Sequence, residues 1–244
     1  MTPTYNEAEN IGAWVSRVRA ALPEAHLMVI DDNSPDGTAE IARIACAEAG
    51  NAHVIVRTDE RGLGSAYRRA FAIAAAEDTD IVLHLDADLS HDPAALPSMV
   101  KALEDGADMV IGSRYVPGGA TLNWPPHRRL LSRWGNRYTA AVLGLKLRDI
   151  TSGFRGYRHD ALEVIDAPST SAEGYAFLTE LALRASDGGL KVTEVPILFA
   201  DRTAGTSKMS WRIISESMLL VTRWGVARRF RALRRRLRRT TLDR

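Results

Sequence analysis

The sequence predicts an α/β protein with a mostly parallel central sheet flanked by helices. Along the first half, short apolar runs alternate with segments whose apolar residues recur at helical spacing, which is the pattern of βαβ units. Two acidic segments, residues 31–36 and 86–88, directly follow apolar runs. Ligands of open parallel sheets bind beyond the carboxyl ends of the strands, so these two segments mark the expected binding edge.

The expected strands are apolar runs at residues 27–30, 53–56, 81–85 and 109–111. The first helix begins near Glu9, and the later helices of this half cover residues 38–49, 65–77 and 94–105. The second half is less regular, with a Gly/Pro-rich loop at 116–126, helices at 130–143 and 174–185, and a strand at 192–199. Since no linker or repeat divides the chain, we expect one domain over residues 1–222 and a basic tail at 223–244.

Length and composition are those of a globular chain with a sizeable core, at 244 residues, 45% apolar and 25% charged. No apolar stretch approaches the roughly 20 residues that span a bilayer, and no signal sequence opens the chain, so we expect a cytoplasmic protein. Cys46 is the only cysteine and lies in an alanine-rich helical pattern. A small buried apolar role is expected for it, and no intramolecular disulfide.

Asp86 and Asp88, separated by Ala87, follow the apolar run at 81–85. Two carboxylates at this spacing can hold a divalent cation that carries a diphosphate. Tyr5, Glu7 and Asp32 also follow expected strand ends, and an aromatic ring beside carboxylates suits a base and a ribose. The alternative interpretation of these acidic and amide side chains is turn formation and helix capping, which Asn6 and Asp36 also suit.

The net charge of +2 is unevenly distributed. Residues 223–244 hold ten arginines and one aspartate, a net +9, which leaves −7 for residues 1–222. Within this tail, apolar residues recur at helical spacing among the arginines, at Val226, Phe230, Leu233 and Leu237. The pattern favours an interfacial helix on an anionic membrane. A solvated terminal helix is the alternative, and a nucleic-acid partner is not expected because no interleaved aromatic stacking platform accompanies the arginines.

The whole pattern resembles the polyprenol monophosphomannose synthases and dolichol-phosphate mannosyltransferases, which are inverting glycosyltransferases with the GT-A nucleotide-binding fold. The resemblance runs from Pro3 to about Trp224. The segments that carry it are Pro-Thr-Tyr-Asn-Glu at 3–7, Asp-Asp-Asn-Ser-Pro-Asp-Gly-Thr at 31–38, Asp-Ala-Asp-Leu-Ser-His at 86–91, Gly-Ser-Arg-Tyr at 112–115, Asn-Trp-Pro at 123–125, Ser-Gly-Phe at 152–154, Glu-Val-Pro at 194–196 and Gly-Thr-Ser-Lys at 205–208. It implies a nucleotide-sugar half at 1–115 and an acceptor half at 116–222.

The resemblance also implies roles for single residues. The positions that hold the guanosine of GDP-mannose are Pro3, Tyr5, Glu7, Ile30 and Asp32. The donor and metal positions are Asp86, Ala87 and Asp88, and the basic residues of the nucleotide site are Arg114, Arg202 and Lys208. Asp88 and Arg114 are the expected catalytic residues, since a bound cation and a guanidinium would both offset charge on the departing diphosphate.

The metal site departs from the common form of the family. Ser90 stands where many members have glutamine, and its short hydroxyl reaches a cation only through water. The expected metal residues are Asp86, Asp88 and Ser90. His91 is an alternative nitrogen ligand that suits Mn²⁺ better than Mg²⁺, although a structural role in the turn is favoured.

The start of the chain also departs from the family. Only Met1 and Thr2 precede Pro3, where family members have an apolar first strand. We therefore expect the central sheet to lack a strand. Two explanations stay open: the sequence starts downstream of the natural start, which is favoured, or the sheet closes differently with a loss of packing of several kcal/mol.

The activity that the resemblance implies is metal-dependent, inverting transfer of mannose from GDP-mannose to a polyprenyl monophosphate, with Mg²⁺ or Mn²⁺ as cofactor. The acceptor phosphate is already anionic and needs no general base, and Arg114, Arg128 or Arg129 is expected to orient it. The alternatives are a polyprenyl-phosphate glucosyltransferase that uses UDP-glucose and a non-catalytic membrane-binding module. We expect peripheral contact with the cytoplasmic face of a membrane through the tail, and an integral membrane partner stays open.

Overall fold

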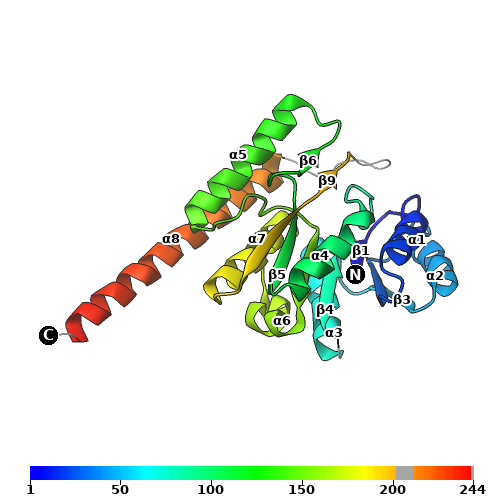
Figure 1. Ribbon diagram of the computed structural model, residues 1–244, viewed down its shortest axis with the longest axis horizontal. Helices are drawn as coiled ribbons and strands as arrows, with labels where there is room; N and C mark the ends of the chain where they lie inside the picture. Colours follow the sequence, from blue (N-terminus) through cyan, green and yellow to red (C-terminus); the bar gives the residue numbers. More distant parts are fainter. Residues whose placement is uncertain (78, 202–210, 243–244) are drawn as a thin grey trace.

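The computed structural model describes residues 1–77, 79–201 and 211–242 and shows the expected α/β architecture (Figure 1). Strands lie in the middle of the body, helices cover them, and the last helix runs out from the body toward the C-terminus. The strands of the described residues form a three-stranded, a four-stranded and a two-stranded sheet. The predicted fold class is confirmed, with the strands divided among these sheets.

The first sheet is parallel and consists of β1 (Thr2–Thr4), β2 (Leu27–Asp31) and β3 (Ala52–Val56). Helices α1 (Ile11–Ala21) and α2 (Thr38–Ala49) cover one face of this sheet. Helix α3 (Leu63–Ala76) covers the other face. Leu27 and Val29 of β2 pack with α1 and α2, where Cys46 is buried as predicted. Met28 and Ile30 point to the other face and pack with α3. This burial on both faces explains why β2 is an unbroken apolar run.

The second sheet has the order β4-β7-β5-β8. Its strands are β4 (Ile81–His84), β5 (Met109–Ser113), β7 (Arg155–Arg158) and β8 (Val192–Pro196). Strand β7 is antiparallel to both neighbours and was not expected, because its Arg-Gly-Tyr-Arg sequence has no apolar run. Gly156 lies at its centre, where a Cβ atom would lie 2.6 Å from Leu83 Cδ2 and 2.8 Å from Val110 Cγ1. Only glycine therefore fits between the neighbouring strands.

The remaining elements are the 3₁₀ helices η1 (Pro93–Ala95) and η2 (Ala167–Ser169), the helices α4 (Leu96–Glu104), α5 (Pro126–Leu143), α6 (His159–Ile165), α7 (Gly174–Asp187) and α8 (Trp211–Leu242), and the paired strands β6 (Ala120–Thr121) and β9 (Leu198–Phe199). The strands and helices predicted in the first half agree with the structure to within two residues. In the second half, the predicted strand at 192–199 is interrupted at Ile197, and the helix predicted from 130 begins at Pro126. Strand β6 and helix α6 were not expected.

The expectation of a missing first strand is wrong. Residues Thr2–Thr4 form β1, which pairs with β2 in the register Thr2–Val29. The amino group of Met1 donates a hydrogen bond of 2.7 Å to the carbonyl oxygen of Leu83 in β4. Burial of this amino group lowers its pKa to about 5. Three residues are thus enough to pair with β2 and to reach the second sheet.

Helix α8 is continuous across residue 222, where the sequence predicts the tail to begin. It lies along α5, to which the hydroxyl pair Tyr138–Thr222 joins it at 2.7 Å (Figure 1). Arg228 pairs with Asp187 of α7 at 2.8 Å and donates to the carbonyl oxygen of Leu143. The first turns of the predicted tail are therefore packed against the body, while the division at 222 stays a prediction.

Two of the four apolar tail residues can be placed. Val226 and Phe230 are 47% and 62% exposed, so this apolar face meets solvent. The side chains of Leu233 and Leu237 lie outside the described part. No helix within the described residues combines the length and the apolarity needed to cross a bilayer.

Candidate active site

A cavity of about 680 Å³ opens at the carboxyl ends of β1, β2, β4 and β5, the edge that the sequence predicts for ligand binding. Helices α3, α5, α7 and α8 contribute its other walls. The predicted site residues that line it are Pro3, Tyr5, Glu7, Asp32, Asp86, Ala87, Asp88, Ser90 and Arg114. Residues more than 100 positions apart in the sequence thus lie around one space.

Among the described residues, one predicted site residue, Ile30, does not line the cavity. The side chain of Ile30 is 1% exposed and packs with Met28 and α3 in the core, so it is not available to a ligand. Arg202 and Lys208 lie outside the described residues, and their roles stay predictions.

The two aspartates lie directly beyond β4 and have different surroundings. Asp88 is 3% exposed, and its Oδ1 accepts hydrogen bonds from the backbone amide of Ser90 at 3.1 Å and from the Ser90 hydroxyl at 2.6 Å. Asp86 packs over Gly153, where a Cβ atom would lie 3.1 Å from both carboxylate oxygens. Ser90 therefore fixes the rotamer of Asp88, and Gly153 in the loop at 152–154 packs against the carboxylate of Asp86.

This donor set fits a divalent cation that is shared with a diphosphate. Mg²⁺ is commonly held by one or two carboxylates, with phosphate oxygens and water as its other ligands. Asp86 and Asp88 would provide the carboxylates. Across the described part of the chain, no group of three or more His, Cys, Asp or Glu side chains is placed to hold a metal alone.

The alternative ligand His91 lies beside this pair. Its Nδ1 is 3.8 Å from Asp86 Oδ2, and its ring meets Phe154 and Phe199 edge-on. The residue is 1% exposed. These contacts agree with the structural role favoured for His91, and whether Ser90 or His91 binds metal stays a prediction.

Tyr5, Glu7 and Asp32 lie at the end of the cavity formed by β1 and β2. Arg61 was not predicted from the sequence. Its guanidinium lies 5.4 Å from the centre of the Tyr5 ring. The capping alternative is also realised here: Asp36 accepts hydrogen bonds from the Ala8 and Thr38 amides at 3.1 Å. The acidic segment after β2 therefore both shapes the loop and faces the cavity.

Asp32 forms a buried ion pair that the sequence did not predict. Its Oδ1 accepts a hydrogen bond of 2.8 Å from Arg57 Nε, and its Oδ2 accepts one of 2.8 Å from the Gly62 amide. Arg57 is 5% exposed. Asp32 thereby fixes the loop that leads into α3, and its predicted contact with a nucleotide would add to this role.

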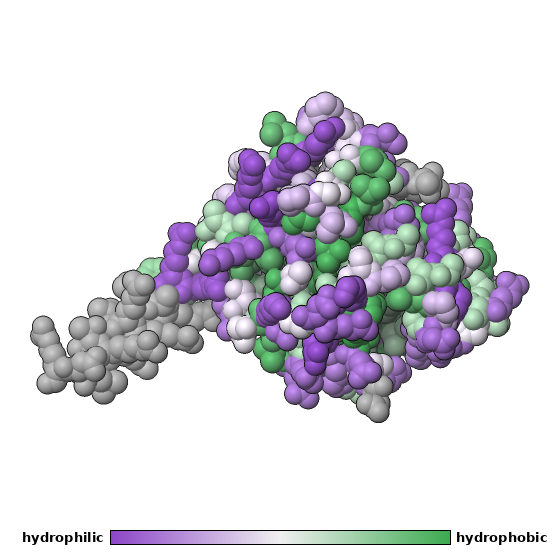
Figure 2. All heavy atoms as spheres, viewed as in Figure 1, coloured by the Kyte–Doolittle hydropathy of each residue, from purple (hydrophilic) through white to green (hydrophobic). Residues whose placement is uncertain are grey.

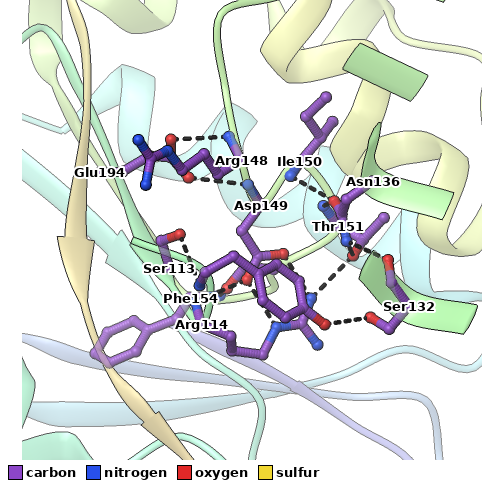
Figure 3. Close-up of polar contacts among 12 residues, drawn as sticks. Ser113, Arg114, Ser132, Asn136, Arg148, Asp149, Ile150, Thr151, Phe154 and Glu194 are labelled. Carbon is purple, nitrogen blue, oxygen red and sulfur yellow. Dashed lines mark hydrogen bonds and ion pairs between the residues drawn. The ribbon is translucent and has the colours of Figure 1, made fainter. Parts of the chain in front are cut away.

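A second buried ion pair joins Arg114 to Asp149 (Figure 3). Arg114 Nε and Nη2 donate to the two carboxylate oxygens at 2.7 and 2.6 Å, and the Arg114 amide donates to Oδ2 at 2.9 Å. Asp149 is fully buried and Arg114 is 7% exposed. Asp149 therefore offsets the charge that Arg114 was predicted to bring to a diphosphate, and the catalytic role of Arg114 stays a prediction.

The loop around Asp149 is held by further side chains that sequence reasoning missed (Figure 3). Asn136 of α5 accepts hydrogen bonds from the amides of Ile150 and Thr151 at 2.8 and 3.2 Å. Glu194 of β8 accepts bonds from the amides of Arg148 and Asp149, both at 2.9 Å. The signal available in the sequence was Asp149, just before the Ser-Gly-Phe segment. Its partner Arg114 lies 35 positions earlier, so the pair could not be recognised.

Basic and apolar side chains also line the cavity. Arg128 pairs with Asp201 at 2.9 Å, and its guanidinium lies 4.0 Å from the centre of the Trp124 ring. The lining residues of α5 and α8 include the apolar Leu131, Trp134, Met218 and Val221 beside the polar Ser132, Asn136, Thr139 and Ser217. In the space-filling view, hydrophilic and hydrophobic residues lie side by side around α5 (Figure 2). The cavity thus has acidic, basic and apolar side chains in its lining.

We expect Asp149→Asn to lower the free energy of unfolding by about 3–5 kcal/mol, because it leaves the buried charge of Arg114 uncompensated. Urea denaturation followed by circular dichroism measures the change. The matched control is Asp105→Asn, which removes an exposed partner of Lys101 and is expected to cost less than about 1 kcal/mol. An equal decrease in the free energy of unfolding in both variants would show that the buried pair stabilises the protein no more than the exposed one.

Comparison with known proteins agrees with this geometry. The family model described as glycosyl transferase family 2 matches residues 1–166. The chain is 44% identical to the undecaprenyl-phosphate mannosyltransferase of Micrococcus luteus, over 96% of each chain. It is also 44% identical to the polyprenol monophosphomannose synthase of Mycolicibacterium smegmatis, over 92% of this chain and 85% of that protein.

Solved structures show the same fold at greater distance. Glucosyl-3-phosphoglycerate synthase from Mycobacterium tuberculosis, in complex with Mn²⁺, UDP and phosphoglyceric acid, matches 90% of this chain and 74% of that one with a TM-score of 0.65 and 20% identity. The same enzyme with Mg²⁺ and UDP matches with a TM-score of 0.65 and 21% identity, over 91% of this chain and 77% of that one. The GT-A type fold and the resemblance to polyprenyl-phosphate mannosyltransferases are confirmed, and the chain belongs to glycosyl transferase family 2.

Proposed function

We propose that this protein transfers mannose from GDP-mannose to the phosphate of a polyprenyl monophosphate. The observation that carries the proposal is the 44% identity to a named undecaprenyl-phosphate mannosyltransferase over 96% of both chains. The cavity supports it, because its lining includes carboxylates that suit a metal-bound diphosphate and apolar side chains that suit a polyprenyl chain. The relatives favour mannose over the glucose alternative, and the two aspartates in the cavity speak against a purely non-catalytic module.

Asp86 and Asp88 would hold Mg²⁺ or Mn²⁺ together with the diphosphate of the donor. The distant fold relatives with Mn²⁺ or Mg²⁺ and UDP support a divalent cation of this class. Such a cation stabilises negative charge on a departing diphosphate. Ser90 and the loop at 152–154 keep the two carboxylates in place before the ligand arrives.

The reaction that follows is displacement at the anomeric carbon. An oxygen of the acceptor phosphate forms the new bond to that carbon, the bond to GDP breaks, and the configuration inverts. A phosphate oxygen is anionic at neutral pH, so the protein needs to align it rather than deprotonate it. Arg128 is our candidate for this task, since it lines the cavity and its ion pair with Asp201 is partly exposed, unlike the buried pair of Arg114.

The test is transfer of radiolabelled mannose from GDP-mannose to a polyprenyl phosphate, with UDP-glucose in parallel. We expect mannolipid, lost with EDTA and restored by Mg²⁺ or Mn²⁺. Asp88→Asn is expected to lower turnover by at least about 100-fold, because the carboxylate no longer offsets the cation charge. Asp92→Asn, at an exposed helix cap outside the cavity, is the control. Glucolipid as the sole product, or full activity of the Asp88 variant, would contradict the proposal.

Arg128→Ala is expected to raise the KM for the acceptor by about 10-fold or more and to leave the KM for GDP-mannose unchanged, because a charge-assisted bond to phosphate is lost. Steady-state kinetics with each substrate varied in turn measures both constants. The neighbouring Arg129 donates to the Trp124 carbonyl oxygen at 3.4 Å and is not among the cavity residues. Arg129→Ala is therefore the matched control, and equal changes in the two variants would remove Arg128 from the acceptor site.

We further propose that the arginine-rich end of α8 holds the protein at the cytoplasmic face of an anionic membrane. Each arginine near such a surface contributes about 1 kcal/mol, so Arg→Gln at 234, 235 and 238 should lower partitioning onto phosphatidylglycerol vesicles by about 100-fold. Flotation at low and high salt measures this. The control carries the same change at Arg17, Arg43 and Arg69, which are exposed on the body. Equal flotation of both triple variants would refute the contact.

A further inference from the structure

The hydroxyl of Tyr67 is buried at the wall of the cavity. Tyr67 is 1% exposed and lines the cavity together with Asp86 and Ala87. Its hydroxyl oxygen finds no hydrogen-bond partner among the residues that the structure describes. A buried polar group without a partner costs about 1–3 kcal/mol, and such groups in native proteins are few. This position therefore calls for an explanation in terms of function.

The ring of Tyr67 is held firmly, so the hydroxyl cannot swing away to find water. It stacks on Phe177 of α7, with ring centres 5.5 Å apart and planes 2° apart. The ring of His84 lies 4.6 Å away on β4. A side chain packed between two elements in this way presents its polar atom in one direction.

The hydroxyl stays protonated at any working pH. Burial is the main cause that raises the pKa of Tyr67 well above its usual value, and the charge of Asp86 adds to the effect. A protonated hydroxyl beside the carboxylates serves as a hydrogen-bond donor toward an oxygen. The missing partner is therefore an acceptor.

The location of Tyr67 indicates which part of a ligand would supply this acceptor. Leu63, Ala66 and Tyr67 share one face of the first two turns of α3, and all three line the cavity. The loop just before them holds Arg61 over the ring of Tyr5. Tyr67 therefore lies in the same wall as Tyr5 and Asp86, the residues that we expect to face the nucleotide.

We propose that Tyr67 is a donor-binding residue whose hydroxyl donates a hydrogen bond to an oxygen of the nucleoside diphosphate bound against Asp86. The inference rests on the proposed function for the identity of the ligand. The free protein carries the unpartnered hydroxyl, and the bound nucleotide satisfies it. Removing the hydroxyl should therefore have opposite effects on stability and on binding.

Tyr67→Phe tests this, because it keeps the ring and its stacking on Phe177. We expect the Tm to equal or exceed that of the wild type and the Kd for GDP with Mn²⁺ to rise by about 2- to 13-fold, which is the loss of one hydrogen bond. Thermal unfolding and titration calorimetry measure the two quantities, with UDP titrated in parallel. The same Kd ratio is expected for GDP-mannose.

The matched control is Tyr157→Phe. Tyr157 is also fully buried, but its hydroxyl pairs with His84 Nε2 at 3.2 Å and it does not line the cavity. This variant should lower the Tm and leave the Kd unchanged. An unchanged Kd in Tyr67→Phe, or a lowered Tm, would overturn the role of Tyr67 while the proposed function stands. A wild-type protein that binds neither GDP nor UDP would overturn both.

Discussion

The buried ion pair between Arg114 and Asp149 is the interaction on which the site depends. Arg114 follows β5, and Asp149 lies in the loop between α5 and β7, so the pair joins the sheet to the half of the chain that closes the cavity. Asn136 and Glu194 fix the main chain of the same loop. That loop continues to Gly153, on which Asp86 rests. The loop that supports a proposed metal ligand is thus anchored by a buried pair of opposite charges, which solvent screens little.

The parallel half of the fold could be predicted because its signals are local. A strand such as β2, buried on both faces, is a continuous apolar run, and the helices around it show their own period. Strand β7 could not be predicted, because Arg155 is buried by donating to the carbonyl oxygens of Ser152 and Leu178 rather than by being apolar. Strand β1 was missed for another reason: its three residues gain their order from pairing with β2.

The candidate site divides in the same way. Its expected ligand-binding residues follow strand ends, so position in the sequence was enough to bring Tyr5, Asp32, Asp86 and Asp88 together. The partners of Asp32 and Arg114 were not visible, because Arg57 and Asp149 reach them across 25 and 35 positions of the sequence. Tyr67 lies in an expected helix and the sequence did not single it out; it is distinguished by lining the cavity with a hydroxyl that has no partner among the described residues. A sequence shows which side chains can do chemistry, while burial and pairing show which of them are already engaged.

Helix α8 both lines the cavity and extends away from the body (Figure 1). Met218 and Val221 line the cavity, and the same helix continues without a break to Leu242. At 1.5 Å per residue, the stretch from Val221 to Leu242 measures about 30 Å. A continuous helix transmits orientation as well as distance, so whatever captures its far end also sets the angle at which the cavity faces that surface. Helix α8 thereby sets both the distance and the orientation of the cavity relative to that surface. A helix break inserted after Arg228 would leave attachment possible but would no longer fix this distance and orientation.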